Sequence, residues 1–221
     1  MSRLGILGGM FDPVTLGHVN AACHARELLH LDTVKLVPCN QPNHKDSAHE
    51  GATHRLKMLE LAIASIPQLE VDSCEIDRGD VSYAVDTLRF LRQRNSRSQL
   101  VFILGIDSFN SLLSWHHWQD LMDLCHFCVL PRDEEQVNVE VAHSTGLEAR
   151  QAKQPEELFL SAVGSIYLDT EFSFDSSSTE VRRKLETGNS LNGLLDNSVM
   201  KYIHQHELYG SSANGMRNAI I

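Results

Sequence analysis

Long apolar runs and disulfide-forming cysteine patterns are both missing from this sequence. No stretch approaches the roughly 18 to 20 apolar residues that a membrane span requires. The first residues also lack a basic start followed by an apolar signal core. The five cysteines are odd in number and scattered, which argues against a disulfide framework and suits a reducing compartment. We therefore expect a cytoplasmic protein with reduced thiols and no membrane contact.

Positive charge is scarce as well. The chain carries 19 Lys and Arg residues against 29 Asp and Glu residues, a formal net charge of −10, and it contains no long basic tract. Such a chain repels a polyphosphate backbone, which disfavours generic nucleic-acid binding. A small anionic ligand needs only a few donors at a helix start and one or two cations, so a nucleotide site stays possible.

The zinc-binding pattern in the sequence is incomplete. Cys125-His126-Phe127-Cys128 has one CxxC spacing, and Cys23-His24 and His116-His117 add further ligand types. No second CxxC pair with a matching spacing follows, although structural zinc sites are built on such pairs. We predict that the chain holds no zinc.

Strands and helices are expected to alternate along the chain. Its 221 residues fit a single α/β unit, and its hydrophobic fraction of 42% and charged fraction of 22% are close to the averages of soluble globular proteins. Apolar runs predict strands at 3–8, 33–38, 69–77, 100–105, 127–131 and 165–169. Helical periodicity predicts helices at 16–29, 53–66, 83–94, 179–186 and 199–206. This order predicts the α/β class, with a single doubly wound parallel-sheet (Rossmann-like) domain over residues 1–210 and a disordered tail at 211–221. Residues 132–155 show no firm period, and we expect a surface excursion there.

The first candidate site lies where the first strand ends and the first helix begins, in Gly8–His18 (GGMFDPVTLGH). Paired glycines let a phosphate approach the backbone, and the helix start offers unsatisfied N–H groups and a positive dipole end. Thr15 and His18 are three residues apart, so they project from one face of the first helical turn. We expect the hydroxyl and the imidazole to reach the same triphosphate. Taken alone, each residue is equally well explained as a helix cap or a surface side chain.

This segment resembles the G-x-F-D-P-x-[HT]-x-G-H signature of the HxGH nucleotidyltransferase superfamily, with threonine at the variable position. It is neither a G-x-G-x-x-G dinucleotide fingerprint nor a P-loop with Gly-Lys-Ser/Thr. A second segment, Ser176–Arg182 (SSSTEVR), resembles the I-S-S-T-x-[IV]-R motif of the same family, with Ser176 in place of isoleucine. We expect that replacement to affect packing more than phosphate contact. Without the first motif, Ser177 and Glu180 are explained as a capping box, with Gly188 as the helix stop.

Three further segments resemble the nicotinate mononucleotide branch of the superfamily. Val37–Lys45 resembles P-x-x-x-P-x-H-K, Ser82–Leu88 resembles S-Y-T-x-x-T-L with Ala84 in place of threonine, and Gly105–Ser108 with Trp115 resembles G-x-D-S-L followed by W. The resemblance implies that an aromatic side chain stacks on the pyridine ring and that helix-start amides receive the nicotinate carboxylate. In isolation, a core tryptophan and a strand-end turn explain the same residues.

The resemblance runs from about Arg3 to Tyr209 and implies bacterial nicotinate-nucleotide adenylyltransferase activity in NAD biosynthesis. ATP and nicotinate mononucleotide would give nicotinate adenine dinucleotide (deamido-NAD) and pyrophosphate, in a monomer or a homodimer. The catalytic residues implied are His18, Arg182 and Lys45. The ATP site implied comprises Gly8, Gly9, Met10, Phe11, Thr15, His18, Gly105, Asp107, Ser177, Ser178, Thr179 and Arg182. The mononucleotide site implied comprises Asp12, His44, Lys45, Tyr83, Ala84, Thr87 and Trp115.

The chemistry implied by the resemblance needs no general base, because the attacking phosphate is already ionised at neutral pH. Alignment and charge stabilisation by Mg²⁺, His18, Arg182, Lys45 and helix-start amides would suffice. We expect Mg²⁺ to be held mainly by the phosphates, and Asp107 to position either the metal or the adenosine ribose. Three alternatives stay open: an adenylyltransferase acting on nicotinamide mononucleotide or phosphopantetheine, a nucleotide sensor without turnover, and a flavin- or NAD-binding oxidoreductase.

Overall fold

A parallel sheet forms the centre of the molecule. The computed structural model describes residues 2–42, 48–132, 135–173 and 176–211. Within these ranges a seven-stranded sheet has the order β3-β2-β1-β4-β5-β7-β6, and every pairing is parallel. The strands are β1 (Arg3–Gly9), β2 (Thr33–Pro38), β3 (Leu69–Val71), β4 (Gln99–Gly105), β5 (His126–Leu130), β6 (Gln151–Ala152) and β7 (Ile166–Leu168). The α/β, doubly wound class predicted from the sequence is therefore confirmed.

Apolar side chains on both faces of the sheet explain why these segments form central strands. Strand β4 is buried along almost its whole length, and its side chains alternate between two cores. Val101 and Ile103 enter one core, whereas Leu100, Phe102 and Leu104 enter the other. A strand that is buried on both faces needs a helix layer on each side.

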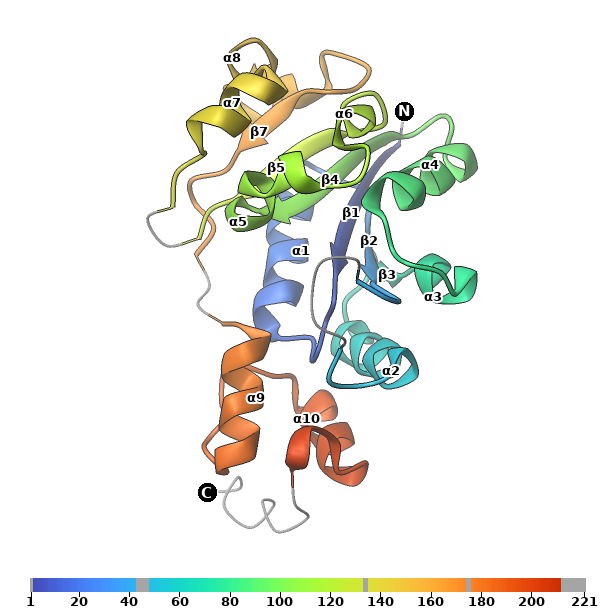
Figure 1. Cartoon of the computed structure of the whole chain (residues 1–221), viewed down its shortest axis with the longest axis vertical. Helices are drawn as coiled ribbons and strands as arrows, with labels where there is room; N and C mark the ends of the chain where they lie inside the picture. The colour runs from blue at the N-terminus through green and yellow to red at the C-terminus, as the bar shows by residue number, and fades with distance from the viewer. Residues whose placement is uncertain (1, 43–47, 133–134, 174–175, 212–221) are drawn as a thin grey trace.

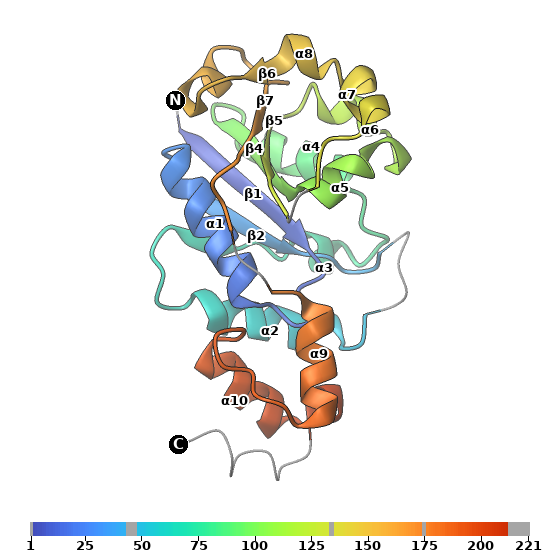
Figure 2. The same cartoon turned by 90° about the vertical axis from the view of Figure 1, so that its left-hand side faces the viewer.

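Helices cover both faces of the sheet, as Figure 2 shows with α1 in front of the strands and α4 behind them. One core packs residues of α1 (Leu16–Leu28), α2 (Ala52–Ile63), α9 (Ser178–Thr187) and α10 (Asn197–Gln205). The other core packs residues of α3 (Cys74–Arg78), α4 (Ala84–Arg94), α5 (Ile106–Asn110), α6 (Trp118–Leu121), α7 (Val139–Thr145) and α8 (Leu147–Arg150). Short 3-10 turns complete the chain at η1 (Leu112–Ser114), η2 (Pro155–Phe159) and η3 (Leu208–Gly210).

Two segments differ from the sequence prediction. The strand expected at 69–77 ends at Val71, because the Asp72 carboxylate accepts the N–H of Cys74 and the short helix α3 begins there. Residues 132–155, expected to be a surface excursion, contain α7, α8 and the edge strand β6. These elements are too short to produce a readable hydrophobic period, and β6 gains its regular backbone only by pairing with β7.

The strand order places the candidate motifs at one edge of the sheet. The order reverses beside β1, whose neighbours are β2 on one side and β4 on the other, and ligands of doubly wound sheets bind at such a switch point beyond the carboxyl ends of the strands. Helices α9 and α10 form a separate layer beneath this edge, next to α2 (Figure 1). Among the described residues, no helix combines the length and the apolar character needed to cross a bilayer.

Candidate active site

Two adjoining cavities open at the carboxyl ends of the central strands. The larger, of about 800 Å³, is here called the phosphate cleft because its rim includes His18 and Arg182, and the smaller, of about 370 Å³, is called the ring pocket because Tyr83 and Trp115 line it. The residues that line both cavities are Gly8, Gly9, Met10, Phe102, Ser108 and Trp115. A ligand with a polyphosphate and a ring can therefore occupy both at once across this common wall.

His18 is held in one orientation by its neighbours. Its Nδ1 accepts the backbone N–H of Thr15 at 3.0 Å and lies 2.8 Å from the Thr15 hydroxyl, and its ring packs edge-on against the Phe11 ring, with centroids 5.2 Å apart. Because an amide N–H can only donate, Nδ1 is the unprotonated nitrogen, and Nε2 carries the N–H of the neutral ring. Burial and the nearby charge of Arg132 lower the pKa of His18 from 6.5 to about 4. His18 is thus a neutral hydrogen-bond donor at physiological pH.

The side chain of Thr15 does not take the expected place. Thr15 is only 2% exposed and is absent from the residues lining the phosphate cleft. Its hydroxyl contacts His18 and receives a hydrogen bond from the Ser176 hydroxyl at 3.0 Å. The prediction that Thr15 and His18 reach the same anion is therefore wrong for Thr15, which orients the imidazole instead.

Ser176 also differs from the expectation that its replacement of isoleucine concerns packing. Its hydroxyl accepts the N–H of Gly17 at 3.2 Å and donates to Thr15 Oγ1. The residue therefore connects the start of α1 with the segment before α9 through polar contacts. The motif comparison missed this because isoleucine has no group that can hydrogen-bond.

The start of α9 is bonded directly to the loop that precedes α1. Ser177 caps α9 by accepting the N–H of Glu180, and Gly188 ends the helix with φ 66°, as predicted. Ser178 donates to Pro13 O at 2.8 Å, and Arg182 Nη1 donates to Asp12 O at 2.6 Å. The two helix beginnings expected to converge on one polyphosphate do line one cleft.

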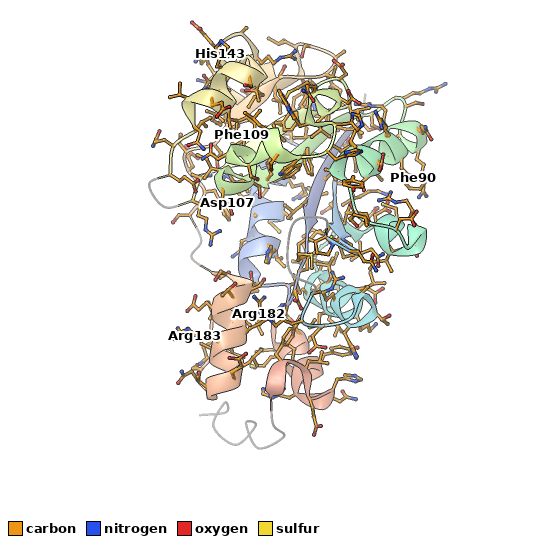
Figure 3. All side chains as sticks on the ribbon, viewed as in Figure 1. Phe90, Asp107, Phe109, His143, Arg182 and Arg183 are labelled. Atoms are coloured by element: carbon orange, nitrogen blue, oxygen red, sulfur yellow. The ribbon has the colours of Figure 1, made fainter. Side chains whose placement is uncertain are left out.

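Arg182 retains its positive charge without a neutralising acid. It donates hydrogen bonds to a carbonyl oxygen and to the Thr179 hydroxyl, and among the described residues no carboxylate lies within ion-pair distance of it. In Figure 3, Arg182 lies where α9 meets the loop before α1, whereas Arg183 lies on the outer side of the helix. An unneutralised guanidinium at a helix start suits phosphate oxygens.

The opposite wall of the phosphate cleft carries an ion pair. Asp107, in the first turn of α5, accepts a hydrogen bond from Arg132 Nη1 at 3.2 Å, and both side chains are about half exposed. The Asp107 carboxylate lies close to the backbone of Gly105, and only glycine leaves room for it, because a Cβ at position 105 would lie 2.6 Å from Asp107 Oδ1. Arg132 was not predicted, although a basic residue just beyond the carboxyl end of the buried strand β5 could have been flagged by the fold.

The ring pocket combines aromatic walls with the beginning of α4. Tyr83 is the N-cap of α4 and packs on the His116 ring, with centroids 4.4 Å apart. Trp115 packs against the Phe102 ring and donates from Nε1 to Ser111 Oγ at 3.1 Å. The first turn of α4, which begins at Ala84, leaves backbone N–H groups without intrahelical acceptors. The pocket therefore offers flat apolar surface and a local positive dipole end.

Thr87 lines the ring pocket, but its hydroxyl has a protein partner. It donates to Glu75 Oε1 at 2.6 Å, and both residues are more than nine-tenths buried. Burial raises the pKa of Glu75, although hydrogen bonds from Ser82 and Thr87 act in the opposite direction. Thr87, which the resemblance assigns to the mononucleotide site, thus lines the pocket and also fixes its wall through Glu75. Glu75 was missed because the segment 69–77 was expected to be a strand.

Asp12, which the resemblance assigns to the mononucleotide site, lines the phosphate cleft and not the ring pocket. The residue is 4% exposed, and its carboxylate accepts the N–H groups of His49 and Glu50 and the hydroxyl of Tyr209. His49 Nδ1 lies a further 3.3 Å away. With both oxygens already bonded to the protein, Asp12 acts as an anchor for the surrounding loops.

The other predicted residues divide between the two cavities. Of the residues expected to bind ATP, those that line the phosphate cleft are Gly8, Gly9, Met10, Phe11, His18, Gly105, Asp107, Ser177, Ser178, Thr179 and Arg182. Of the residues expected to bind the mononucleotide, those that line the ring pocket are Tyr83, Ala84, Thr87 and Trp115. His44 and Lys45 lie outside the described residues.

The carboxylates that line the phosphate cleft do not form a metal cage. Asp12 and Asp107 are engaged by protein donors, and within the described part of the chain no group of three or more His, Cys, Asp or Glu residues could hold a metal ion. Cys125 and Cys128 of the CxxC segment are free, buried thiols, and burial raises the pKa of both. A divalent ion that enters with a nucleotide would depend mainly on the phosphate oxygens for its ligands.

Comparison with known proteins assigns the chain to a family. The cytidylyltransferase-like family model matches residues 6–184. A probable nicotinate-nucleotide adenylyltransferase from Pseudoalteromonas atlantica is 38% identical, with 95% of both chains covered. A protein of the same name from Cellvibrio japonicus is 39% identical, over 93% of this chain and 98% of the relative.

Solved structures agree with this assignment at the level of the fold. The Plasmodium falciparum nicotinic acid mononucleotide adenylyltransferase complexed with NaAD has a TM-score of 0.76 at 19% identity, covering 96% of this chain and all of that one. A second structure of that enzyme, complexed with APC, has a TM-score of 0.74 at 17% identity. Taken with the extent of the family match and of the bacterial relatives, these findings establish that the chain belongs to the cytidylyltransferase-like family, in its nicotinate-nucleotide adenylyltransferase branch.

Proposed function

We propose that this chain transfers the adenylyl group of ATP to nicotinate mononucleotide, giving nicotinate adenine dinucleotide and pyrophosphate. The observation that carries the proposal is the convergence of the α1 and α9 beginnings on one cleft that shares a wall with an aromatic pocket. The names of the bacterial relatives support the same reaction.

On the ATP side, His18 and Arg182 act on the triphosphate. The neutral His18 ring donates from Nε2 to an oxygen near the scissile bond, and the Arg182 guanidinium, not neutralised by an acid, binds oxygens of the departing pyrophosphate. Backbone groups of Gly8 and Gly9 and the helix-start residues Ser177 to Thr179 complete the cradle. Arg132 is a further cation that lines the cleft.

On the acceptor side, the pyridine ring lies against Trp115 and Tyr83. The nicotinate carboxylate points to the free N–H groups at the start of α4, which a neutral amide would engage more weakly. Ala84 supplies such a donor from its backbone, so the absence of the threonine hydroxyl at this position is tolerated. His44 and Lys45 are proposed to contact the mononucleotide phosphate.

The reaction is an in-line displacement at the α-phosphorus of ATP. An oxygen of the mononucleotide phosphate forms a new bond to that phosphorus, and the bond from the same phosphorus to the oxygen bridging to the β-phosphate breaks. The electron pair leaves with pyrophosphate, and no proton has to be removed from the nucleophile. His18 and Arg182 stabilise the charge that develops on the leaving group, while the common wall of the two cavities holds the reacting atoms in line.

ATP enters as its complex with a divalent metal, which we assign as magnesium. The metal supplies charge neutralisation at the phosphates, and Asp107 is the carboxylate of the cleft nearest to solvent. Because the carboxylates of the cleft already have protein partners, chelation with EDTA is expected to abolish turnover while leaving the thermal unfolding temperature unchanged.

The direct test measures product formation with three acceptors. The purified protein is incubated with ATP, magnesium and nicotinate mononucleotide, nicotinamide mononucleotide or phosphopantetheine, and pyrophosphate and the dinucleotide are quantified. We expect turnover with nicotinate mononucleotide and at least tenfold lower kcat/KM with the nicotinamide form, equivalent to about 1.4 kcal/mol of discrimination. Turnover preferring phosphopantetheine, or no pyrophosphate with any acceptor, contradicts the proposal.

A further inference from the structure

We propose that Tyr209, near the C-terminal end of the described chain, is a positioning residue for Arg182 and acts through Asp12. The inference rests on the proposed function, because its readout is the turnover of that reaction. Tyr209 lies in η3, which is 27 residues beyond Arg182 along the chain and contacts α9 in space. Tyr209 belongs to none of the sequence motifs from which the site was predicted, whereas Arg182 ends the second of them.

The contacts of Tyr209 are specific and buried. Its side chain is 8% exposed, its hydroxyl donates to Asp12 Oδ1 at 2.7 Å, and its backbone N–H donates to Glu50 Oε1 at 2.9 Å. Glu50 in turn donates its own N–H to Asp12 Oδ1 at 3.3 Å. Tyr209 therefore bonds to both acids of one small network, and a phenylalanine in its place would keep the packing but lose one donor.

Asp12 passes this constraint to the catalytic cation. Its side chain is anchored by Tyr209 and by the loop at His49, while its carbonyl oxygen accepts Arg182 Nη1 at 2.6 Å. The anchored side chain fixes the position of the Asp12 Cα atom, to which this carbonyl group is attached. Tyr209 thus helps to hold the carbonyl oxygen that orients the Arg182 guanidinium at the cleft.

The loop needs such an anchor. Phe11, the residue before Asp12, has φ 48°, a left-handed conformation that a bulky side chain adopts only when surrounding contacts impose it. The hydroxyl of Tyr209 stays protonated, because burial and the hydrogen bond to Asp12 raise its pKa. The donor is therefore present across the whole pH range in which the enzyme could work.

The test compares two tyrosine hydroxyls in the same C-terminal region. Tyr202 on α10 also bonds through its hydroxyl, but its partner is His54 Nδ1 at 3.0 Å, whereas the partner of the Tyr209 hydroxyl is Asp12. We expect Tyr209→Phe to lower kcat about tenfold through loss of a hydrogen bond to a charged group, with less than twofold change in KM for nicotinate mononucleotide. Both substitutions should lower the unfolding temperature by a similar amount, because each removes one hydrogen bond. Tyr202→Phe, in contrast to Tyr209→Phe, should leave kcat unchanged.

A double-mutant cycle separates positioning from a merely structural role. In an Arg182→Lys background, Tyr209→Phe should cost less than twofold in kcat, because the group that it positions is already altered. Asp12→Asn provides a second variant that keeps the size and should show the same coupling to Arg182→Lys. Equal kcat in the two tyrosine variants, or a tenfold loss that persists in the Arg182→Lys background, overturns the proposal. Turnover of the unmodified enzyme tests the proposed function, and the variants test the role of Tyr209. The two proposals can therefore fail independently.

Discussion

The phosphate cleft and the ring pocket share a wall but are built from different groups. The phosphate cleft gathers His18, Arg182 and Arg132 with the beginnings of two helices. The ring pocket is lined by aromatic side chains and by the start of α4, and the buried acid Glu75 in its wall accepts a hydrogen bond from the Thr87 hydroxyl. Positively charged side chains dominate the first cavity, whereas flat apolar surface and backbone donors dominate the second.

This difference separates rate from selectivity. A side-chain donor aimed at developing charge contributes more in the transition state than in the ground state, so its loss lowers kcat. A ring surface or a backbone donor binds ground state and transition state alike, so its loss raises KM. Substitutions in the phosphate cleft should therefore be costly in kcat, and substitutions in the ring pocket should be moderate and appear in KM.

The largest effect is expected for His18→Ala. Removing one donor to the developing charge should lower kcat roughly 10²- to 10³-fold, or about 2.7–4 kcal/mol, with the circular dichroism spectrum unchanged. His143→Ala, on the exposed surface of α7 away from both cavities (Figure 3), is the matched control and should retain normal turnover. Near-normal kcat in the His18 variant would remove the role assigned to this residue.

The next largest effect is expected for Arg182→Ala, with a loss of roughly 10²-fold in kcat. Its guanidinium has no acid partner among the described residues, so the substitution removes an interaction with phosphate and not a structural ion pair. The adjacent Arg183 is exposed and lies on the other side of α9, so Arg183→Ala is expected to be neutral. Steady-state kinetics with pyrophosphate detection distinguishes the two. Equal losses would mean that α9 contributes general positive charge and not a directed contact.

In the ring pocket, Thr87→Val should raise KM for nicotinate mononucleotide about fivefold while KM for ATP and kcat change less than twofold. The substitution leaves Glu75 without one buried donor, which loosens the pocket wall. Thr145→Val, which removes another buried hydroxyl in the distant helix α7, is the control for stability alone. A loss confined to kcat would erase the proposed distinction between the cavities.

The smallest effect concerns the pKa of His18. Arg132→Gln should raise that pKa above its value of about 4, because removal of a neighbouring positive charge favours the imidazolium form. The folded-state pKa lies below the unfolded value of 6.5, so the contribution of His18 to stability is complete above pH 6.5 and is lost as the pH falls toward 4. Nuclear magnetic resonance titration of the ring measures the shift. Arg97→Gln, at the amino end of β4, should leave it unchanged.

The central parts of this fold and of its cleft could be predicted because they follow local rules. Uninterrupted apolar runs in β1, β2, β4 and β5 gave strands at the expected positions, and the Ser-x-x-Glu pattern at Ser177 marked the start of α9, which that serine caps. The motif at Gly8–His18 placed His18 in the cleft. By contrast, α7, α8 and β6 escaped prediction because each is too short for a hydrophobic period and depends on its neighbours in space.

The sequence by itself determined the parallel α/β architecture, the family and many of the residues that line the two cavities, since apolar pattern, helix caps and glycine positions act over a few residues. The tertiary structure alone decided which polar groups face a ligand and which face one another. Thr15, Thr87 and Asp12 all occupy motif positions, yet each is bonded to a residue far along the chain or turned toward a neighbour. A hydroxyl or carboxylate that is buried takes whatever donor or acceptor the fold brings within about 3 Å, and that choice depends on three-dimensional proximity, which residue spacing does not encode.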